Sequence, residues 1–321
     1  MILNRVRIIL MSRRHLVALS LALPLVLTGC SALGDESKDG LQVAAAFYPL
    51  QYAAERVAGD LAEVDNLTLP GKEPHDLELT VSETALIVEA DLVVFEDGFQ
   101  PAVDDGIDQN AEGAVLDVSG PADLLPIEDG HDAESEEEHA EHEEEHDHGD
   151  LDPHFWQDPL RLAAVGDAIA EELAEVDPDH ADDFRDNAAE MRADLEALDQ
   201  EYAAGLADCE RDTIVVSHDA FGYLAKYGLH LAPVAGLSPD AEPTPGDLAD
   251  LQQLIDDEGI TTVFSETLGS PRFTRPLAED LGLRTDVLDP LEGLASEDDT
   301  SDYLSLMRDN LSALREANGC R

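Results

Sequence analysis

The sequence predicts an α/β fold of two lobes with mainly parallel sheets, joined by one long rigid helix, and three observations support this. Short β-branched or apolar runs alternate with helical stretches in both halves of the chain, an order typical of parallel sheets covered on both faces. Residues 178–206 separate the halves and carry a helical apolar stripe. The chain has 321 residues, 43% of them hydrophobic, which suffices for two domain cores.

The amino-terminal end has the pattern of an export signal. Four arginines precede an apolar run at residues 16–27, which is too short to span a membrane as a mature helix. The run ends in Leu-Thr-Gly-Cys, which resembles a lipobox, so residues 1–29 are predicted to be a signal peptide and Cys30 to receive lipid. The arginine pair at 13 and 14 also resembles a twin-arginine signal. Either route predicts an extracytoplasmic protein, lipid-anchored to the cell membrane.

A tether at residues 30–40 leads into the predicted first lobe, residues 41–177. Short apolar runs predict its strands and helical spacing predicts its helices. The predicted strands are residues 43–47, 67–69, 91–97 and 114–119, and the predicted helices are residues 50–58 and 83–89.

The segment "DPDHADDFRDNAAEMRADLEALDQEYAAGLADC" predicts the linking helix at residues 178–206, about 40 Å long at 1.5 Å per residue. Its apolar residues recur at spacings of three and four, which places them on one face. They are Phe184, Ala188, Met191, Leu195, Leu198, Tyr202 and Leu206. A coiled-coil segment is the alternative, but the stripe stops after about four heptads and α/β patterns flank it.

The second lobe, residues 207–321, repeats the alternation of strand and helix. Thr244 followed by Pro245 is typical of a helix N-cap and first turn. The predicted strands are residues 213–217, 231–236, 261–266 and 285–289; the predicted helices run through Tyr223, over 244–257, after Pro271 and over 301–317.

Charge and cysteine usage limit the partners and the compartment. The net charge of -55 would repel nucleic acid and anionic membrane surfaces and favours cations or basic surfaces; it also fits life at high salt. Beyond Cys30 the chain has only Cys209 and Cys320, too far apart for a C-x-x-C metal motif. In an oxidising compartment this pair predicts a disulfide, with two buried free thiols as the alternative.

Residues 128–150 form an acidic segment with almost no apolar residue, which predicts a disordered loop. Its histidines are His131, His139, His142, His146 and His148. We interpret it as an auxiliary, low-affinity metal collector; a solvated acidic loop is the alternative. The stretch "HEEEH" matches two zinc-protease motifs at once, but it has no apolar helix face, so we attribute both matches to composition.

Four other residues follow predicted strands or lie in turns: His75, His154, His218 and Asp289. Ligands in open α/β sheets bind outside the carboxyl ends of the strands, so a cleft between the lobes can collect all four. Three imidazoles and one carboxylate suit zinc in tetrahedral geometry, with bonds of about 2.0 to 2.2 Å. Taken singly, each histidine can also be a turn residue bonded to backbone.

Several motifs in this order resemble the cluster A-I metal-binding proteins of ABC importers, and among them the zinc-binding, ZnuA-like members. They are "FYPL", "PHDLELT", the acidic His-rich insertion, "DPHFWQDP", "SHDAFGYLAKYGL", "EPTP" and "LDPL". The resemblance implies two lobes joined by one long helix, with metal at their interface.

By motif, the family's histidine ligands fall on His75, His154 and His218, and Asp289, a nearby Glu or water completes the shell. Manganese members usually carry Glu at the third position, so His218 implies zinc. Where other members have an aromatic-Asn turn, this chain has "FEDGFQP".

The leading hypothesis is a monomeric receptor, not an enzyme, that captures Zn²⁺ outside the membrane and delivers it to an ABC permease. The alternatives within the fold are a receptor for manganese or another divalent metal and an adhesin-type lipoprotein. A more distant alternative is a secreted zinc hydrolase with Glu266 as general base. The number of protein ligands discriminates the receptor from the hydrolase, because a shell closed by Asp289 leaves no position for an activated water.

Overall fold

The computed structural model of the chain describes residues 40–127, 151–239, 241–296 and 298–321. The predicted signal peptide, Cys30, which is predicted to receive lipid, and the five histidines of the acidic segment lie outside the described residues. Within the described part, no helix combines the length and apolar character needed to cross a membrane.

The first lobe is built on a parallel sheet in the order β2-β1-β3-β4. Its strands are β1 (Leu41–Ala45), β2 (Ala62–Asn66), β3 (Leu92–Phe95) and β4 (Ala114–Asp117). Its helices are α1 (Tyr48–Ala58), α2 (Val81–Glu89), α3 (Pro101–Asn110) and the short α4 (Ser119–Ala122). The central strand β3 is wholly buried, in keeping with its continuous apolar sequence, and β1 is buried over its last three residues.

The second strand was predicted at residues 67–69, and this prediction is wrong. The strand is β2, whose sequence AEVDN lies at the sheet edge and alternates acidic with other residues. Leu67 and Thr68 belong to the turn after it, where the Thr68 hydroxyl donates to the backbone oxygen of Ala46 at 2.8 Å. An edge strand with one solvated face does not need the apolar run that we used as the signal.

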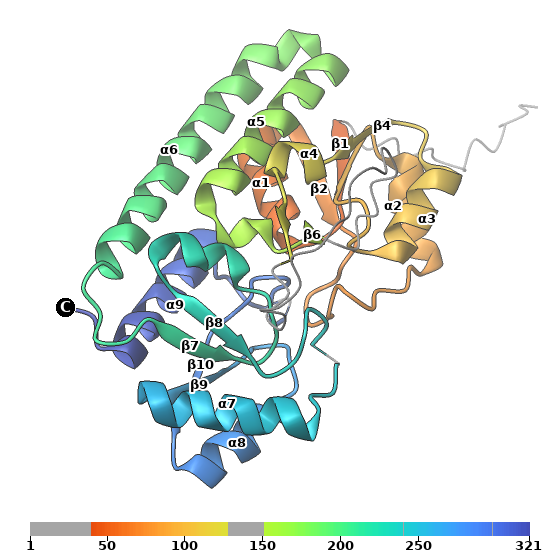
Figure 1. Cartoon of the computed structure of the whole chain (residues 1–321). Helices are drawn as coiled ribbons and strands as arrows, with labels where there is room; N and C mark the ends of the chain where they lie inside the picture. The colour runs from red at the N-terminus through yellow and green to blue at the C-terminus, as the bar shows by residue number, and fades with distance from the viewer. Residues whose placement is uncertain (1–39, 128–150, 240, 297) are drawn as a thin grey trace, which may run out of the picture. The chain divides into compact units, whose positions relative to one another are not determined.

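The second lobe repeats this topology in a sheet ordered β10-β9-β7-β8, with all pairs parallel. Its strands are β7 (Thr213–Val216), β8 (His230–Pro233), β9 (Thr262–Ser265) and β10 (Arg284–Val287). Helices α7 (Pro245–Glu258) and α8 (Thr274–Leu281) cover one face and α9 (Tyr303–Asn318) covers the other (Figure 1). The Thr244 capping box at the start of α7 confirms the predicted helix start.

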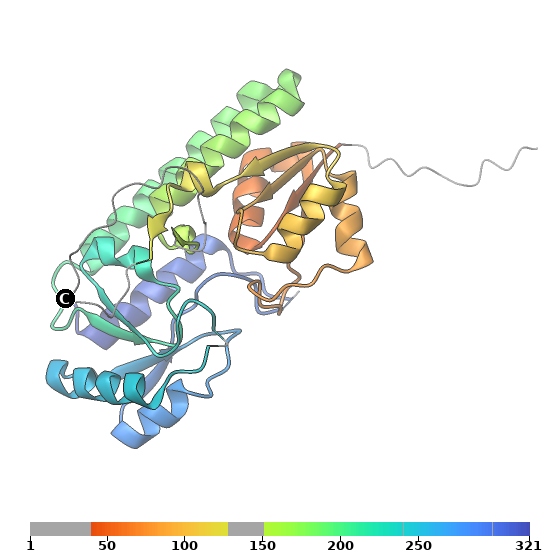
Figure 2. The ribbon, with the colours of Figure 1, turned by 45° about the vertical axis from the view of Figure 1, so that its right-hand side comes forward.

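Two helices connect the lobes. Helix α5 (Pro159–Val176), absent from the predicted elements, leads through a short 3-10 turn at Pro178–His180 into α6 (Ala181–Gly205), the linking helix. The α6 stripe is buried as expected, but largely against α5, and Figure 2 shows the two helices side by side. A Cβ added at Gly166 of α5 would lie 3.0 Å from the sulfur of Met191, so the pair approaches closely. The linking helix is therefore half of a helical hairpin rather than an isolated rod.

One buried hydrophobic cluster is continuous through both lobes. It extends from the β1 and β3 residues through α5 and α6 to Leu288, Leu291 and Tyr303 of the second lobe. A smaller cluster fills the space between the second sheet and helices α7 and α8. The carboxyl-terminal end is also fixed, because Cys320 forms a disulfide with Cys209, just before β7.

Candidate metal centre

The structure brings His75, His154, His218 and Glu292 together at the junction of the lobes. One ligand atom from each lies within 4.8 Å of the others, and all but His75 are buried. His75 follows β2, His218 follows β7 and Glu292 follows β10. His154 follows β6 (Leu151–Asp152), which pairs antiparallel with β5 (Leu125–Pro126) on either side of residues 128–150. Three ligands thus come from the carboxyl ends of parallel strands, as expected for an open α/β sheet.

Four of the six separations between the ligand atoms match the edges of a tetrahedral shell. Glu292 Oε1 lies 3.3 Å from the Nε2 atoms of His154 and His218 and 3.5 Å from that of His75. The Nε2 atoms of His154 and His75 are 3.4 Å apart. A tetrahedron with zinc-ligand bonds of about 2.0 to 2.1 Å has edges of about 3.3 to 3.4 Å. These residues can therefore close around one zinc ion with little movement.

The motif "DPHFWQDP" fixes His154 from two sides. Asp152 Oδ1 accepts a hydrogen bond from the His154 backbone N–H at 3.0 Å and lies 2.8 Å from ring Nδ1. The following 3-10 turn (Phe155–Gln157) is buried, and the side-chain N–H groups of Trp156 and Gln157 both donate to Pro290 O at 2.7 Å. Because Pro290 lies two residues before Glu292, this motif also fixes the loop that carries the carboxylate.

A carboxylate also holds His218 by the outer ring nitrogen. Glu266 Oε1 lies 2.5 Å from His218 Nδ1, and the Ser217 hydroxyl donates to the same oxygen. Such carboxylate–histidine pairs orient metal-binding imidazoles and set which nitrogen faces the metal. Glu266 therefore lies behind a ligand and is engaged there, which is not the position of a general base acting on metal-bound water.

His75 is the least enclosed of the four residues. Its side chain is 13% exposed, and its ring meets the Phe99 ring edge-on with centroids 4.8 Å apart. The loop that carries it reaches the other lobe, where the Gly71 N–H donates to Leu294 O at 2.7 Å. Gly71 has φ +79°, a conformation suited to glycine. This backbone contact joins the His75 loop to the Glu292 loop.

Hydrogen bonds within this group shift the pKa values of Glu292, His218 and His154. Burial alone would raise the pKa of Glu292, but hydrogen bonds to His154, His218 and His75 outweigh it and hold that pKa well below its usual range. Burial alone would lower the pKa of His218, but hydrogen bonds to Glu266 and Glu292 raise it to about 10. The pKa of His154 is raised in the same way, against burial, by Asp152 and Glu292.

The structure does not bring Asp289, the predicted fourth ligand, into this group. Its Oδ2 accepts a hydrogen bond from the Thr267 hydroxyl at 2.6 Å and its Oδ1 accepts one from the Leu291 N–H at 2.8 Å. Glu292 lies in the place expected for Asp289. The sequence "LDPLEG" contains both carboxylates, and only the path of the turn determines which one faces the imidazoles.

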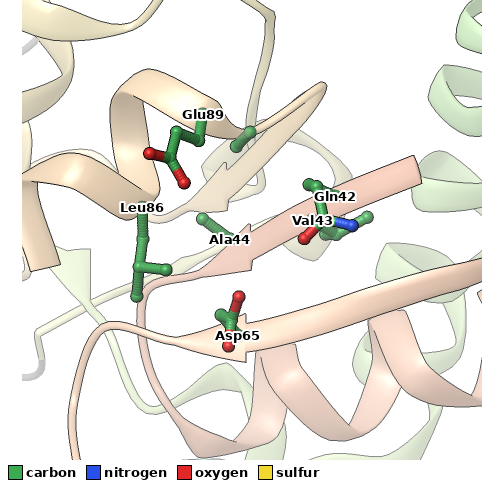
Figure 3. A pocket seen from close by; sticks show the side chains of 7 residues that line it. Gln42, Val43, Ala44, Asp65, Leu86 and Glu89 are labelled. Atoms are coloured by element: carbon green, nitrogen blue, oxygen red, sulfur yellow. The ribbon is translucent and has the colours of Figure 1, made fainter. Parts of the chain in front are cut away.

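Two other polar features lie outside the group. A small hollow over β1, β2 and the end of α2 is lined by Asp65 and Glu89, with no histidine or cysteine among its lining residues (Figure 3). In the motif "FEDGFQP", Glu96 is 2% exposed and its Oε2 has no hydrogen-bond partner among the described residues. Burial, with the charge of Asp152 adding to it, raises the pKa of Glu96 well above its usual range.

Comparisons with known proteins find relatives named for zinc binding or zinc uptake. Residues 43–317 match the family model described as zinc-uptake complex component A, periplasmic. The chain is 35% identical, over 91% of its length, to the zinc-binding lipoprotein AdcA of Streptococcus pneumoniae, but spans only 58% of that protein. It is 34% identical to the high-affinity zinc uptake system protein ZnuA of Bacillus subtilis, covering 88% of this chain and 89% of that one.

A solved structure is similar as well. The crystal structure of the Zn(II)-bound ZnuA-like domain of Streptococcus pneumoniae AdcA superposes with a TM-score of 0.70 at 32% identity. The superposition covers 87% of this chain and 99% of that domain. The resemblance therefore extends over both lobes and the helices between them.

Proposed function

The chain belongs to the family of the zinc-uptake complex component A, and from this membership we propose that it is a receptor that binds Zn²⁺ outside the cytoplasm and delivers it to an ABC permease. The observation that carries the proposal is the set of four buried or half-buried ligand atoms at tetrahedral spacing. In this role zinc is the cargo, and His75, His154, His218 and Glu292 are its proposed ligands.

The donor set supports zinc over manganese. Three imidazoles and one carboxylate oxygen form a borderline-soft shell of four, whereas manganese prefers more oxygen donors. The three Nε2 atoms surround a single carboxylate oxygen, Glu292 Oε1.

A receptor fits the site better than a hydrolase. Four protein ligands would close the shell and leave no position for an activated water, which zinc hydrolysis requires. Glu266, the proposed base of the hydrolase alternative, is hydrogen-bonded to His218 on the side away from the other ligands.

The sequence supplies the remaining parts of the proposal. A lipid on Cys30 would keep the receptor at the membrane surface near its permease. The histidines of residues 128–150 would gather zinc weakly close to the junction of the lobes, since β5 and β6 fix both ends of that segment beside His154. We propose that the receptor acts as a monomer.

Calorimetric titration with zinc, in the presence and absence of competing manganese, tests the proposal on the mature protein. His154→Ala should abolish the tight site, whereas deletion of residues 131–148 should remove only weaker sites. His180→Ala is the matched control, because His180 is half-exposed and bonded to Asp183 away from the site. Tight binding that survives His154→Ala and disappears with residues 131–148 would overturn the assignment.

A further inference from the structure

The turn before Glu292 has an unusual backbone conformation. Leu291 has φ +61°, one of two positive values among the described non-glycine residues, and its side chain is fully buried. A bulky residue rarely adopts this left-handed conformation, which persists only where the surroundings impose it. Such strain is common next to functional groups, and here the next residue is the buried carboxylate of the metal centre.

The side chain of Asp289 is hydrogen-bonded across this turn. Its Oδ1 accepts the hydrogen bond of the Leu291 N–H at 2.8 Å and closes a tight turn around Pro290. Its Oδ2 accepts from the Thr267 hydroxyl at 2.6 Å, which ties the turn to the loop after β9. Both carboxylate oxygens are therefore used to hold the backbone.

The backbone of Asp289 is fixed in turn by α9. The Asp289 N–H donates to Asn310 Oδ1 at 2.9 Å, and Asn310 Nδ2 donates to Asp289 O at 2.6 Å. Asn310 is only 3% exposed, so water has little access to this pair of bonds. The turn is thus attached to α9 and β9 of its own lobe, and through Pro290 to Trp156 and Gln157.

We infer that Asp289 is a positioning residue: by holding Leu291 in its left-handed conformation, it directs the Glu292 carboxylate at the three imidazoles. This inference rests on the proposed zinc receptor function. Metal affinity depends on ligand placement to a fraction of an ångström, and residues that orient ligands typically change affinity 10-fold to 100-fold when removed. Asp289 therefore contributes to zinc affinity without contacting the ion.

Two substitutions of Asp289 separate positioning from ligation. In Asp289→Asn, the amide oxygen can still accept from Leu291 N–H and the amide nitrogen can donate to the Thr267 hydroxyl, but the anionic zinc ligand is lost. Asp289→Ala removes both bonds. We expect zinc affinity within a few-fold of wild type for Asp289→Asn and a loss of about 10-fold to 100-fold for Asp289→Ala.

Visible absorption of the Co²⁺-substituted protein gives a second readout, because its intensity and band positions report coordination number and symmetry. The Asp289→Asn spectrum should match wild type, and the Asp289→Ala spectrum should change. Thr267→Val removes only the hydroxyl that anchors Asp289, and it should give an intermediate loss of affinity; it carries the test if Asp289→Ala does not fold.

Two results would overturn the inference: equal losses for Asp289→Asn and Asp289→Ala, which would make Asp289 a ligand, or wild-type affinity in both Asp289→Ala and Thr267→Val. Failure of the proposed function has a different signature, namely the absence of tight zinc binding in the wild-type protein.

Discussion

Zinc binding should release protons, and the apparent affinity should therefore rise with pH. His218 has a pKa of about 10 in the metal-free protein, because hydrogen bonds to Glu266 and Glu292 outweigh its burial. At pH 7.5 its imidazole is almost fully protonated, whereas a zinc ligand must be neutral. Each zinc ion must displace at least this proton.

The size of the effect follows from the pKa. Removing the proton at pH 7.5, well below that pKa of about 10, lowers the apparent affinity by roughly two to three orders of magnitude. The direction is fixed by the sign of the shift: a raised histidine pKa makes protons compete with zinc up to pH 10. Affinity should rise about tenfold per pH unit for each proton released. Protonation of His154, whose pKa is also raised, would add to this slope.

Calorimetry in buffers of different ionisation enthalpy, such as Pipes and Tes, measures the number of protons released. We expect one or more at pH 7.5 in the wild-type protein. Glu266→Gln should release fewer, because it removes one of the two carboxylates that raise the His218 pKa, and His180→Ala should behave as wild type. Release of no protons at pH 7.5 would refute the description of the metal-free site as a protonated cluster.

Three further predictions concern the whole molecule. The double variant Cys209→Ser, Cys320→Ser should lower the free energy of unfolding by about 2 to 4 kcal/mol in urea titrations. It should keep its zinc affinity, because Cys209 lies before β7 whereas His218 follows the other end of that strand. Loss of zinc binding in the folded variant would contradict this. With a net charge of -55, the protein should melt at a higher temperature in 2 M than in 0.1 M KCl, because the screening length falls from about 10 Å to under 3 Å; an unchanged or lower melting temperature would count against self-repulsion. Small-angle scattering should give nearly equal radii of gyration with and without zinc, and a large difference would contradict a closed pair of lobes.

The parts of the fold that the sequence predicts best are those whose local pattern and burial agree. Strand β3 is apolar along its length, and α7 has a proline in its first turn after Thr244, so both could be located. Strand β2 and helix α3 escaped this reasoning, since β2 lies at an edge and α3 contains three aspartates and a glycine among ten residues. Strand β2 depends on its pairing with β1, and helix α3 depends on packing against other parts of its lobe. A short stretch of sequence contains neither partner.

The same limit applies to the metal centre. The three histidines stand out because each follows a strand or lies in a proline-bounded turn, and the structure brings all three together. Glu292 has no such signal: it is one of 73 acidic residues, and its inward direction depends on the left-handed backbone at Leu291. Asp289 is instead hydrogen-bonded to Thr267 and Asn310, which are 22 and 21 residues away from it along the chain.

The shared core restricts how zinc can leave. Leu288, Leu291 and Tyr303 of the second lobe belong to the same buried cluster as the first sheet, and the Tyr303 hydroxyl donates to Trp156 O at 2.6 Å. Wide opening of the lobes would expose these side chains at a cost of about 25 cal/mol for each Å² of apolar surface. Among the backbone hydrogen bonds described, a single one, from Gly71 to Leu294, joins the loop that carries His75 to the other lobe. Carboxylates hold the outer ring nitrogens of His154 and His218, but among the described residues none holds that of His75. Release would therefore begin with His75, while His154, His218 and Glu292 keep their places in the core.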